Sequence, residues 1–167
     1  MRDYYVNPIS LEYPGFYFYS YEEYEKKTRG DDVIIQYTGV DPAISRIWYS
    51  ADIKPENLKL WFDADVESMC VEQQAALYYL IKYSGHTLES ALPLIENVIL
   101  CKGDKESYAE GYLEEIGFFD GCQNLELLKK YFDYEAFSRD FVLGGEIFEF
   151  WFSGSYYTIV NASEIEK

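Results

Sequence analysis

The chain contains few of the residues from which catalytic and metal sites are usually built. His86 is its only histidine, and the three cysteines, Cys70, Cys101 and Cys122, are far apart and include no Cys-X-X-Cys pair. This pattern predicts neither a disulfide framework nor a structural zinc site, and we expect three reduced, mostly buried thiols. The sequence also lacks a phosphate-binding glycine loop, a nucleophile elbow and a HExxH motif. It therefore predicts a protein that is not an enzyme and that uses no metal and no cofactor.

Positive charge is also scarce. The chain has 14 lysines and arginines against 30 aspartates and glutamates, a net charge of −16. Direct binding to DNA or to an anionic membrane is disfavoured, because both require a positive surface. The charge is uneven, with a net charge of −3 over residues 1–60 and −13 over residues 61–167. A strongly basic partner, or solubility alone, would explain this excess.

Long apolar runs are missing. The N-terminal segment MRDYYVNPIS has no apolar core of the kind that a signal peptide requires. No apolar run reaches the roughly 20 residues that span a bilayer. Apolar residues nevertheless make up 49% of the chain, which is enough for a packed core. We expect a soluble, cytoplasmic protein.

Tyrosine is abundant, with 18 residues against 11 phenylalanines and three tryptophans. Tyrosine is a rigid, amphipathic contact residue that is enriched at protein interfaces. A surface of acids and tyrosines suits a partner whose groove is lined by lysine and arginine. Some of the tyrosines are expected only to cover sheet edges.

The first sixty residues predict a small β-rich lobe. Strands are predicted where runs of Tyr, Phe, Val and Ile lie between Gly, Pro, Asn and Asp, at 3–6, 15–20 and 32–38. The segment YEEYEKKTRG between the last two strands predicts a short helix, because lysines and then glycine suit a helix C-terminus. Residues 41–57 are interpreted as a connection in which Pro42 and Pro55 act as breakers.

Residues 61–103 predict a central helical segment with one short strand. The pattern is helical over 66–83, and this helix is apolar nearly all round, which favours a central core helix between two layers over a place against a partner chain. Gly85 is expected to stop the helix, and Thr87 to cap the next one. The β-branched run VILC at 98–101 predicts a strand.

The clearest amphipathic helix is DKESYAEGYLEEIG, which Asp104 can cap and Gly117 can end. Its predicted inward face consists of Tyr108, Ala109, Tyr112, Leu113 and Ile116. Its outward face carries a row of glutamates about 6 Å apart, at 106, 110 and 114. Like charges at this spacing cost roughly 0.2–0.5 kcal/mol per pair, and no lysine on that face offsets them. Such a row is explained either by an ordinary solvated helix face or by a function that requires the negative charge.

Two more short helices are predicted at 123–130 and 132–142. In the second, Glu135 and Arg139 stand at i and i+4 and are expected to form an ion pair. The chain then predicts a hairpin in which EIFEFWF, a Ser-Gly turn and SYYTIV follow one another. We therefore predict an α+β fold with a small N-terminal lobe (1–60), a central segment (61–103) and a C-terminal α/β lobe (104–167).

The segment YFDYEAFSRDF (131–141) resembles the signature of the ArdA antirestriction proteins. That signature typically has Tyr, one residue, Asp, Tyr, an acidic or amide residue, Ala and then Arg-Asp. Upstream, TLESALPLIENVILCKGDKESYAEGYLEEIGFFDG (87–121) is similar to the preceding stretch of that family. The resemblance covers about residues 87–160, whereas the N-terminal part keeps only a strand, a turn, a strand and an acidic helix.

The resemblance implies a non-enzymatic function. Members of this family are elongated, acidic dimers from phages and mobile elements, whose carboxylates imitate the phosphates of bent duplex DNA. They occupy the DNA groove of type I restriction–modification enzymes. By this resemblance the candidate mimic charges are Glu106, Glu110, Glu114, Glu115, Asp120, Glu126, Asp133 and Asp140. The motif residues implied to pack the last helix or to form a homodimer contact are Tyr131, Phe132, Tyr134, Phe137, Arg139 and Phe141.

Three other functions stay open at the level of sequence. The first is inhibition of another nucleic-acid-binding defence system, such as a CRISPR effector, which the divergent N-terminal part favours. The second is a small enzyme that uses paired carboxylates with Mg²⁺, which would need a concave site and a carboxyl group with a raised pKa. The third is an acidic adaptor that binds one partner through tyrosines.

Overall fold

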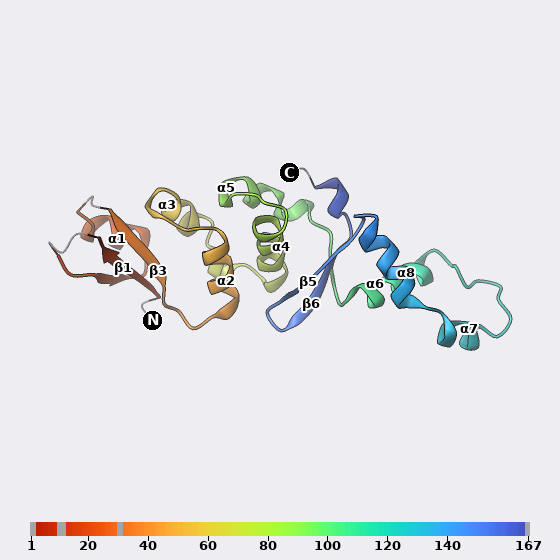
Figure 1. The fold of residues 1–167 in the computed structure, drawn as a ribbon. Helices are drawn as coiled ribbons and strands as arrows, with labels where there is room; N and C mark the ends of the chain where they lie inside the picture. The colour runs from red at the N-terminus through yellow and green to blue at the C-terminus, as the bar shows by residue number, and fades with distance from the viewer. Residues whose placement is uncertain (1–2, 10–12, 30–31, 166–167) are drawn as a thin grey trace. The chain divides into compact units, whose positions relative to one another are not determined.

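The structure is a computed structural model that describes residues 3–9, 13–29 and 32–165. It combines helices with two small antiparallel three-stranded sheets, which confirms the predicted α+β class (Figure 1). The chain divides into two compact units, a first unit of residues 1–95 and a second unit of residues 96–166. In this division residues 61–95 of the predicted central segment belong to the first unit, together with the predicted lobe 1–60, and residues 96–103 belong to the second unit.

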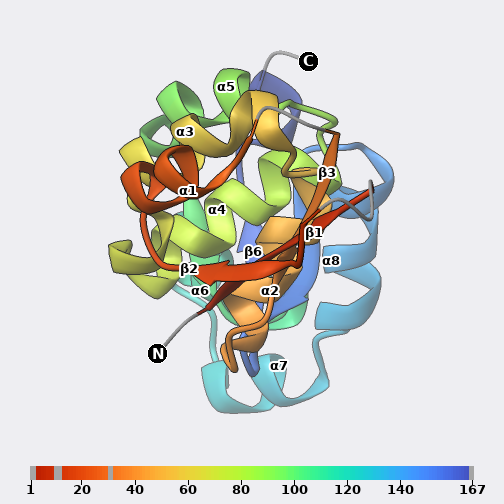
Figure 2. The same cartoon turned by 90° about the vertical axis from the view of Figure 1, so that its left-hand side faces the viewer.

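The first unit begins with a sheet in the order β2-β1-β3. Its strands are β1 (Tyr4–Pro8), β2 (Phe16–Phe18) and β3 (Val33–Tyr37), close to the predicted positions. In β3 alternate side chains are buried and exposed, as expected for a strand with one face on a core. Helix α1 (Tyr21–Lys27) is capped by the Ser20 side chain and packs beside β2 (Figure 2).

The predicted connection at 41–57 was wrong, because this segment contributes to two helices, α2 (Pro42–Ser50) and α3 (Pro55–Asp63). Each proline occupies the first turn of its helix, where a missing N–H removes no helical hydrogen bond and the fixed φ suits the helix. The Asp41 side chain completes the start of α2 by accepting a hydrogen bond from the Ala43 backbone N–H at 2.8 Å. These prolines therefore start helices instead of breaking them.

Helix α4 (Val71–Lys82) follows a short 3-10 turn, η1 (Val66–Ser68), and is buried over all eight residues from Gln74 to Ile81. It packs against α2 and against α5 (Leu88–Ala91), and its burial on all sides agrees with the predicted core helix, although the helix begins at Val71 and not at residue 66. Thr87 caps α5 as predicted and accepts a hydrogen bond from the Ser90 backbone N–H at 3.3 Å. The 3-10 turn η2 (Leu92–Asn97) leads into the second unit.

The second unit has a sheet in the order β4-β6-β5. Its strands are β4 (Leu100–Lys102), β5 (Phe148–Phe152) and β6 (Ser155–Ile159). The predicted hairpin is confirmed: β5 and β6 pair through a turn in which Ser153 and Gly154 have φ values of 45° and 85°. Positive φ at both central residues matches the twist of a two-residue hairpin.

The second unit also contains the helices α6 (Lys105–Glu115), α7 (Leu125–Tyr131) and α8 (Tyr134–Leu143), with a short 3-10 turn, η3 (Ala162–Glu164). Helices α6 and α8 lie side by side (Figure 1). Across the described ranges, every helix falls short of the length and hydrophobicity that a membrane crossing requires.

The expectation of mostly buried thiols was wrong. Cys70 and Cys122 are exposed, and Cys101 is half-buried. Cys70 is the N-cap residue of α4, and Cys122 lies in the turn before α7, so neither side chain belongs to the apolar face of a helix or strand.

Candidate functional site

Helix α6 carries the predicted row of glutamates, and specific residues fix both of its ends. The Asp104 carboxylate accepts hydrogen bonds from the backbone N–H and the hydroxyl of Ser107, at 2.8 and 2.6 Å. Gly117 ends the helix with a φ of 65°, a left-handed conformation that favours glycine. Ala109 and Leu113 are buried and hold the inner face. The outer face of this helix is thus presented from a fixed backbone.

We expect Asp104→Ala to lower the free energy of unfolding by about 1 kcal/mol, because the substitution removes the side-chain cap of α6. Asp104→Asn keeps a hydrogen-bond acceptor and is the matched control. Urea unfolding at neutral pH measures both values. An equal loss in the two variants would show that capping is not the reason.

The same cap predicts a pH dependence. Hydrogen bonds from Ser107 lower the pKa of the Asp104 carboxyl below its usual value. A carboxyl group with a lowered folded pKa contributes stability above its unfolded pKa, and that contribution is lost as the pH falls through the folded pKa. The stability difference between the native protein and Asp104→Asn should therefore shrink on acidification below about pH 4.

Ile116 departs from the predicted inward face of this helix, because its side chain is 53% exposed. It is the C-cap residue, so the helical period that places Ala109 and Leu113 in the core ends before it. Tyr108 and Tyr112, which were also predicted to face inward, are half-buried.

Two of the three glutamates in the row are paired with lysines, so the expectation that no lysine offsets them was wrong. The Lys105 ammonium lies 3.0 Å from Glu106 and 3.7 Å from Glu149. Lys129 of α7 forms an ion pair with Glu114. Glu106 and Glu114 are also the main causes of the raised pKa of Lys105 and Lys129, respectively. Helical periodicity could not reveal Lys129, because it reaches Glu114 from another helix.

Five of the predicted mimic charges are exposed and have no lysine or arginine within 4.0 Å in the part of the chain that the structure describes: Glu110, Glu115, Asp120, Glu126 and Asp140. Asp133 is exposed as well, but it also caps α8 by accepting a hydrogen bond from the Ala136 backbone N–H at 2.8 Å. The five carboxylates of the first set, which we call the acidic set, are therefore free to meet a partner.

The predicted ion pair between Glu135 and Arg139 is absent from the second unit as described. Both side chains are exposed, and they do not come within 4.0 Å of each other. Exposed pairs at this spacing gain only a few tenths of a kcal/mol, so spacing alone does not fix their geometry. Glu135 therefore adds an exposed carboxylate to this region, which its i, i+4 spacing from Arg139 did not predict.

The aromatic residues of segment 131–141 form a series of ring contacts inside the second unit. The Phe132 ring centroid lies 5.5 Å from that of Phe119 and 5.7 Å from that of Phe137. The series continues from Phe137 to Phe141 at 5.0 Å and from Phe141 to Tyr112 of α6 at 5.3 Å. These contacts fasten α8 to α6 and hold the carboxylates of both helices in one body.

Neither the protein-family models nor the curated proteins include a match to this chain. Among the described residues, no three or more histidine, cysteine, aspartate or glutamate side chains gather in a group that could hold a metal ion.

Several other apolar and aromatic residues of the second unit differ in their exposure. Tyr131 is 76% exposed, whereas Tyr134 is half-buried, with its ring centroid 4.9 Å from that of Phe132. Helix α7 has no buried residue and exposes Leu127 and Leu128. The second unit thus combines exposed carboxylates with an apolar helix face.

The negative charge of the second unit is large for its size. Residues 96–166 contain 15 acidic and five basic residues, a net charge of −10. The carboxylates on α6 and α8 are carried by capped helices that pack on each other, so their mutual repulsion is retained at the surface. A surface of this charge favours contact with cationic groups over contact with anionic ones.

Proposed function

We propose that this protein is an acidic DNA mimic that acts in the cytoplasm and inhibits a nucleic-acid-binding defence enzyme, in the first place a type I restriction–modification enzyme. The acidic set is the observation that carries the proposal: its five carboxylates are exposed and unpaired in the described structure. The resemblance of residues 131–141 to the ArdA signature supplies the class of target. In this function the protein catalyses no reaction and needs no cofactor.

The physical basis is competition for a positive groove. An enzyme that binds duplex DNA gains much of its affinity from neutralising phosphates. One helix offers a carboxylate about every 6 Å along a row, whereas duplex DNA carries a charge about every 1.7 Å of its axis. A single helix is therefore too sparse to replace DNA. The acidic set meets this requirement in part, because it adds charges before and along α7 and on α8 to those of α6.

The proposed mode of inhibition predicts a specific salt dependence. We expect the protein to displace a labelled duplex from a purified type I restriction enzyme, with an inhibition constant that rises by about 10-fold or more between 50 and 200 mM salt. Fluorescence anisotropy of the duplex measures this displacement. The matched control is a nucleic-acid-binding defence nuclease of another class, tested under the same conditions. The enzyme whose duplex is displaced at the lower protein concentration is the better candidate target. Inhibition that stays constant over this salt range would contradict a charge-based mechanism.

We also propose that a second copy of the chain covers the exposed apolar face of α7. Leu127 and Leu128 are 56% and 44% exposed, and this helix leads directly into segment 131–141, where the resemblance implies a dimer contact. Sedimentation equilibrium that reports a monomer at micromolar concentrations would contradict a homodimer.

A further inference from the structure

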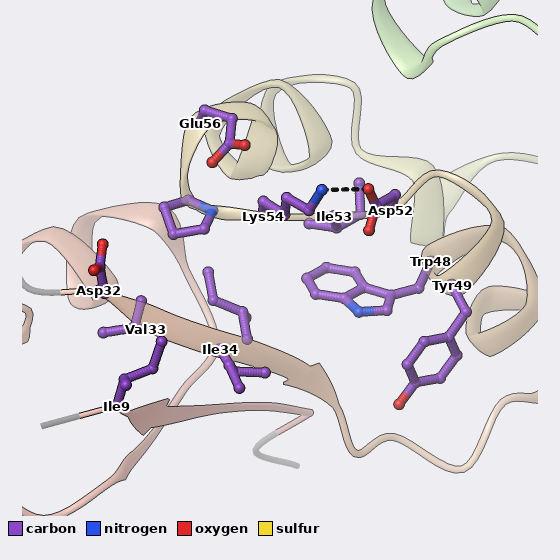
Figure 3. Close-up of a pocket in the computed structure, with 12 residues that line it drawn as sticks. Ile9, Asp32, Val33, Ile34, Trp48, Tyr49, Asp52, Ile53, Lys54 and Glu56 are labelled. Carbon is purple, nitrogen blue, oxygen red and sulfur yellow. Dashed lines mark ion pairs between the residues drawn. The ribbon is translucent and has the colours of Figure 1, made fainter.

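The first unit contains a groove that has no part in DNA mimicry. It has a volume of about 610 Å³ and lies between β3 and the segment that runs from the end of α2 into α3. Apolar groups from both sides line it, namely Val33, Ile35, Trp48, Ile53 and Pro55. Figure 3 shows the side chains of β3 and those of residues 48–56 on opposite sides of this space. The volume is in the range of sites that bind ligands.

One wall of the groove is the open edge of a sheet. Among the strands that the structure describes, β3 pairs with β1 alone, in the sheet order β2-β1-β3. The Ile9 backbone N–H donates a hydrogen bond to the Asp32 backbone carbonyl at 3.0 Å. The Thr38 backbone N–H donates one to the Asp3 backbone carbonyl at 2.6 Å. In an antiparallel ladder such residues alternate with residues whose N–H and C=O groups point away from the partner strand. The outward-pointing residues of β3 are therefore Val33, Ile35 and Tyr37.

Part of this edge is already used, and part is free. The Tyr37 carbonyl accepts a hydrogen bond from the Tyr49 hydroxyl at 3.4 Å. Within the described ranges, the outward N–H and C=O groups of Val33 and Ile35 have no hydrogen-bond partner. Natural sheets usually protect open edges with proline, lysine or a bulge, and β3, with the sequence VIIQY, contains no proline or lysine.

The charges along the groove favour a cationic ligand. Three carboxylates line it, those of Asp32, Asp52 and Glu56, against the single ammonium group of Lys54. That ammonium lies 2.5 Å from Asp52, an ion pair drawn in Figure 3. Asp32 and Glu56 have no cation within 4.0 Å in the described structure and are exposed.

We propose that this groove binds an extended peptide that adds to β3 as a further strand and that alternates apolar residues with lysine or arginine. The main chain of the peptide pairs with the free groups of Val33 and Ile35. Its apolar side chains enter the space beside Trp48 and Ile53, and its cations face the carboxylates of Asp32 and Glu56. This function is independent of the acidic set, because every residue involved belongs to the first unit.

The experiment uses the full chain and a synthetic, acetylated hexapeptide that alternates valine and lysine. Calorimetry measures its affinity, and NMR measures the shifts of the Val33 and Ile35 amides. A matched peptide carries N-methyl groups on alternate residues, so it keeps the side chains but cannot donate the pairing hydrogen bonds. We expect the N-methylated peptide to bind at least about 10-fold more weakly, and a valine–glutamate peptide not to bind.

A protein variant tests the charges. Asp32→Asn combined with Glu56→Gln should weaken binding of the valine–lysine peptide by about 5- to 10-fold, whereas Glu22→Gln combined with Glu25→Gln, on α1, should not change it. The proposal is overturned if the valine–lysine peptide does not bind at millimolar concentration. It is also overturned if the N-methylated peptide binds equally well, because the groove would then be a simple apolar pocket. Loss of DNA competition affects neither outcome.

Discussion

Replacing the acidic set with its neutral amides is expected to weaken inhibition of the target enzyme by about 100- to 1,000-fold. Each exposed carboxylate that meets a lysine or arginine contributes roughly 0.5–1 kcal/mol, and a factor of ten corresponds to about 1.4 kcal/mol. The variant contains Glu110→Gln, Glu115→Gln, Asp120→Asn, Glu126→Gln and Asp140→Asn. Titration of restriction activity against the inhibitor gives the change in the inhibition constant.

A second variant separates position from total charge. It carries Glu22→Gln, Glu25→Gln, Asp63→Asn, Glu72→Gln and Glu89→Gln, five exposed carboxylates of the first unit. Both variants change the net charge from −16 to −11. We expect this control to weaken inhibition by less than about threefold, because only long-range attraction is reduced, and that is screened beyond roughly 10 Å in 0.1 M salt.

Comparison of the two variants can have three outcomes. A loss confined to the acidic set supports a fixed imitation of phosphates by the second unit. Equal losses would mean that total charge matters and that the positions of the carboxylates do not. Unchanged inhibition with the acidic set neutralised would end the proposed function. A loss of inhibition would not be explained by unfolding of α6. Glu110→Gln and Glu115→Gln remove like charges from this helix, so its stability should stay equal or rise slightly.

The elements that could be predicted from the sequence are those that local chemistry determines. The hairpin of β5 and β6 has aromatic and β-branched runs on both sides of Ser153-Gly154, and α6 has Asp104 at its start and Gly117 at its end. Each of these signals lies within a few residues of the structure that it specifies. The start of α2 departs from the prediction although Asp41-Pro42 is also a local signal, because proline suits the first turn of a helix as well as a break between elements.

The features that could not be predicted depend on residues far apart in the sequence. Lys129 meets Glu114 across 15 positions, and Trp61 donates a hydrogen bond to the Tyr4 hydroxyl across 57 positions, at 2.8 Å. The position of β3 at the edge of its sheet could not be predicted for the same reason, because the place of a strand in a sheet follows from its pairing and not from its own residues. The acidic row of α6 was therefore visible in the sequence, but its partial neutralisation and the groove of the first unit were not.

Leu113→Ala is expected to lower the stability of the second unit by about 2–4 kcal/mol, because it leaves a cavity behind the acidic helix. Leu113 is 1% exposed on the inner face of α6. Ile116→Ala is the matched control, since it also removes a branched aliphatic side chain but one that is 53% exposed, and it should change stability by no more than about 0.5 kcal/mol. Sequence periodicity placed both residues on the same inward face, so the pair also tests where α6 ends.

Hydrogen exchange read by mass spectrometry resolves the effect by unit. In Leu113→Ala the amides of α6 should exchange faster, while those of α4 in the first unit should keep their protection. Neither substitution changes a charge, so any loss of inhibition in Leu113→Ala comes from the looser support of the carboxylates. We expect inhibition to weaken by about 10-fold, because part of the binding energy must then order α6. Full inhibition by a variant whose α6 exchanges freely would show that negative charge suffices without a fixed arrangement, and imitation of a DNA backbone would no longer be required.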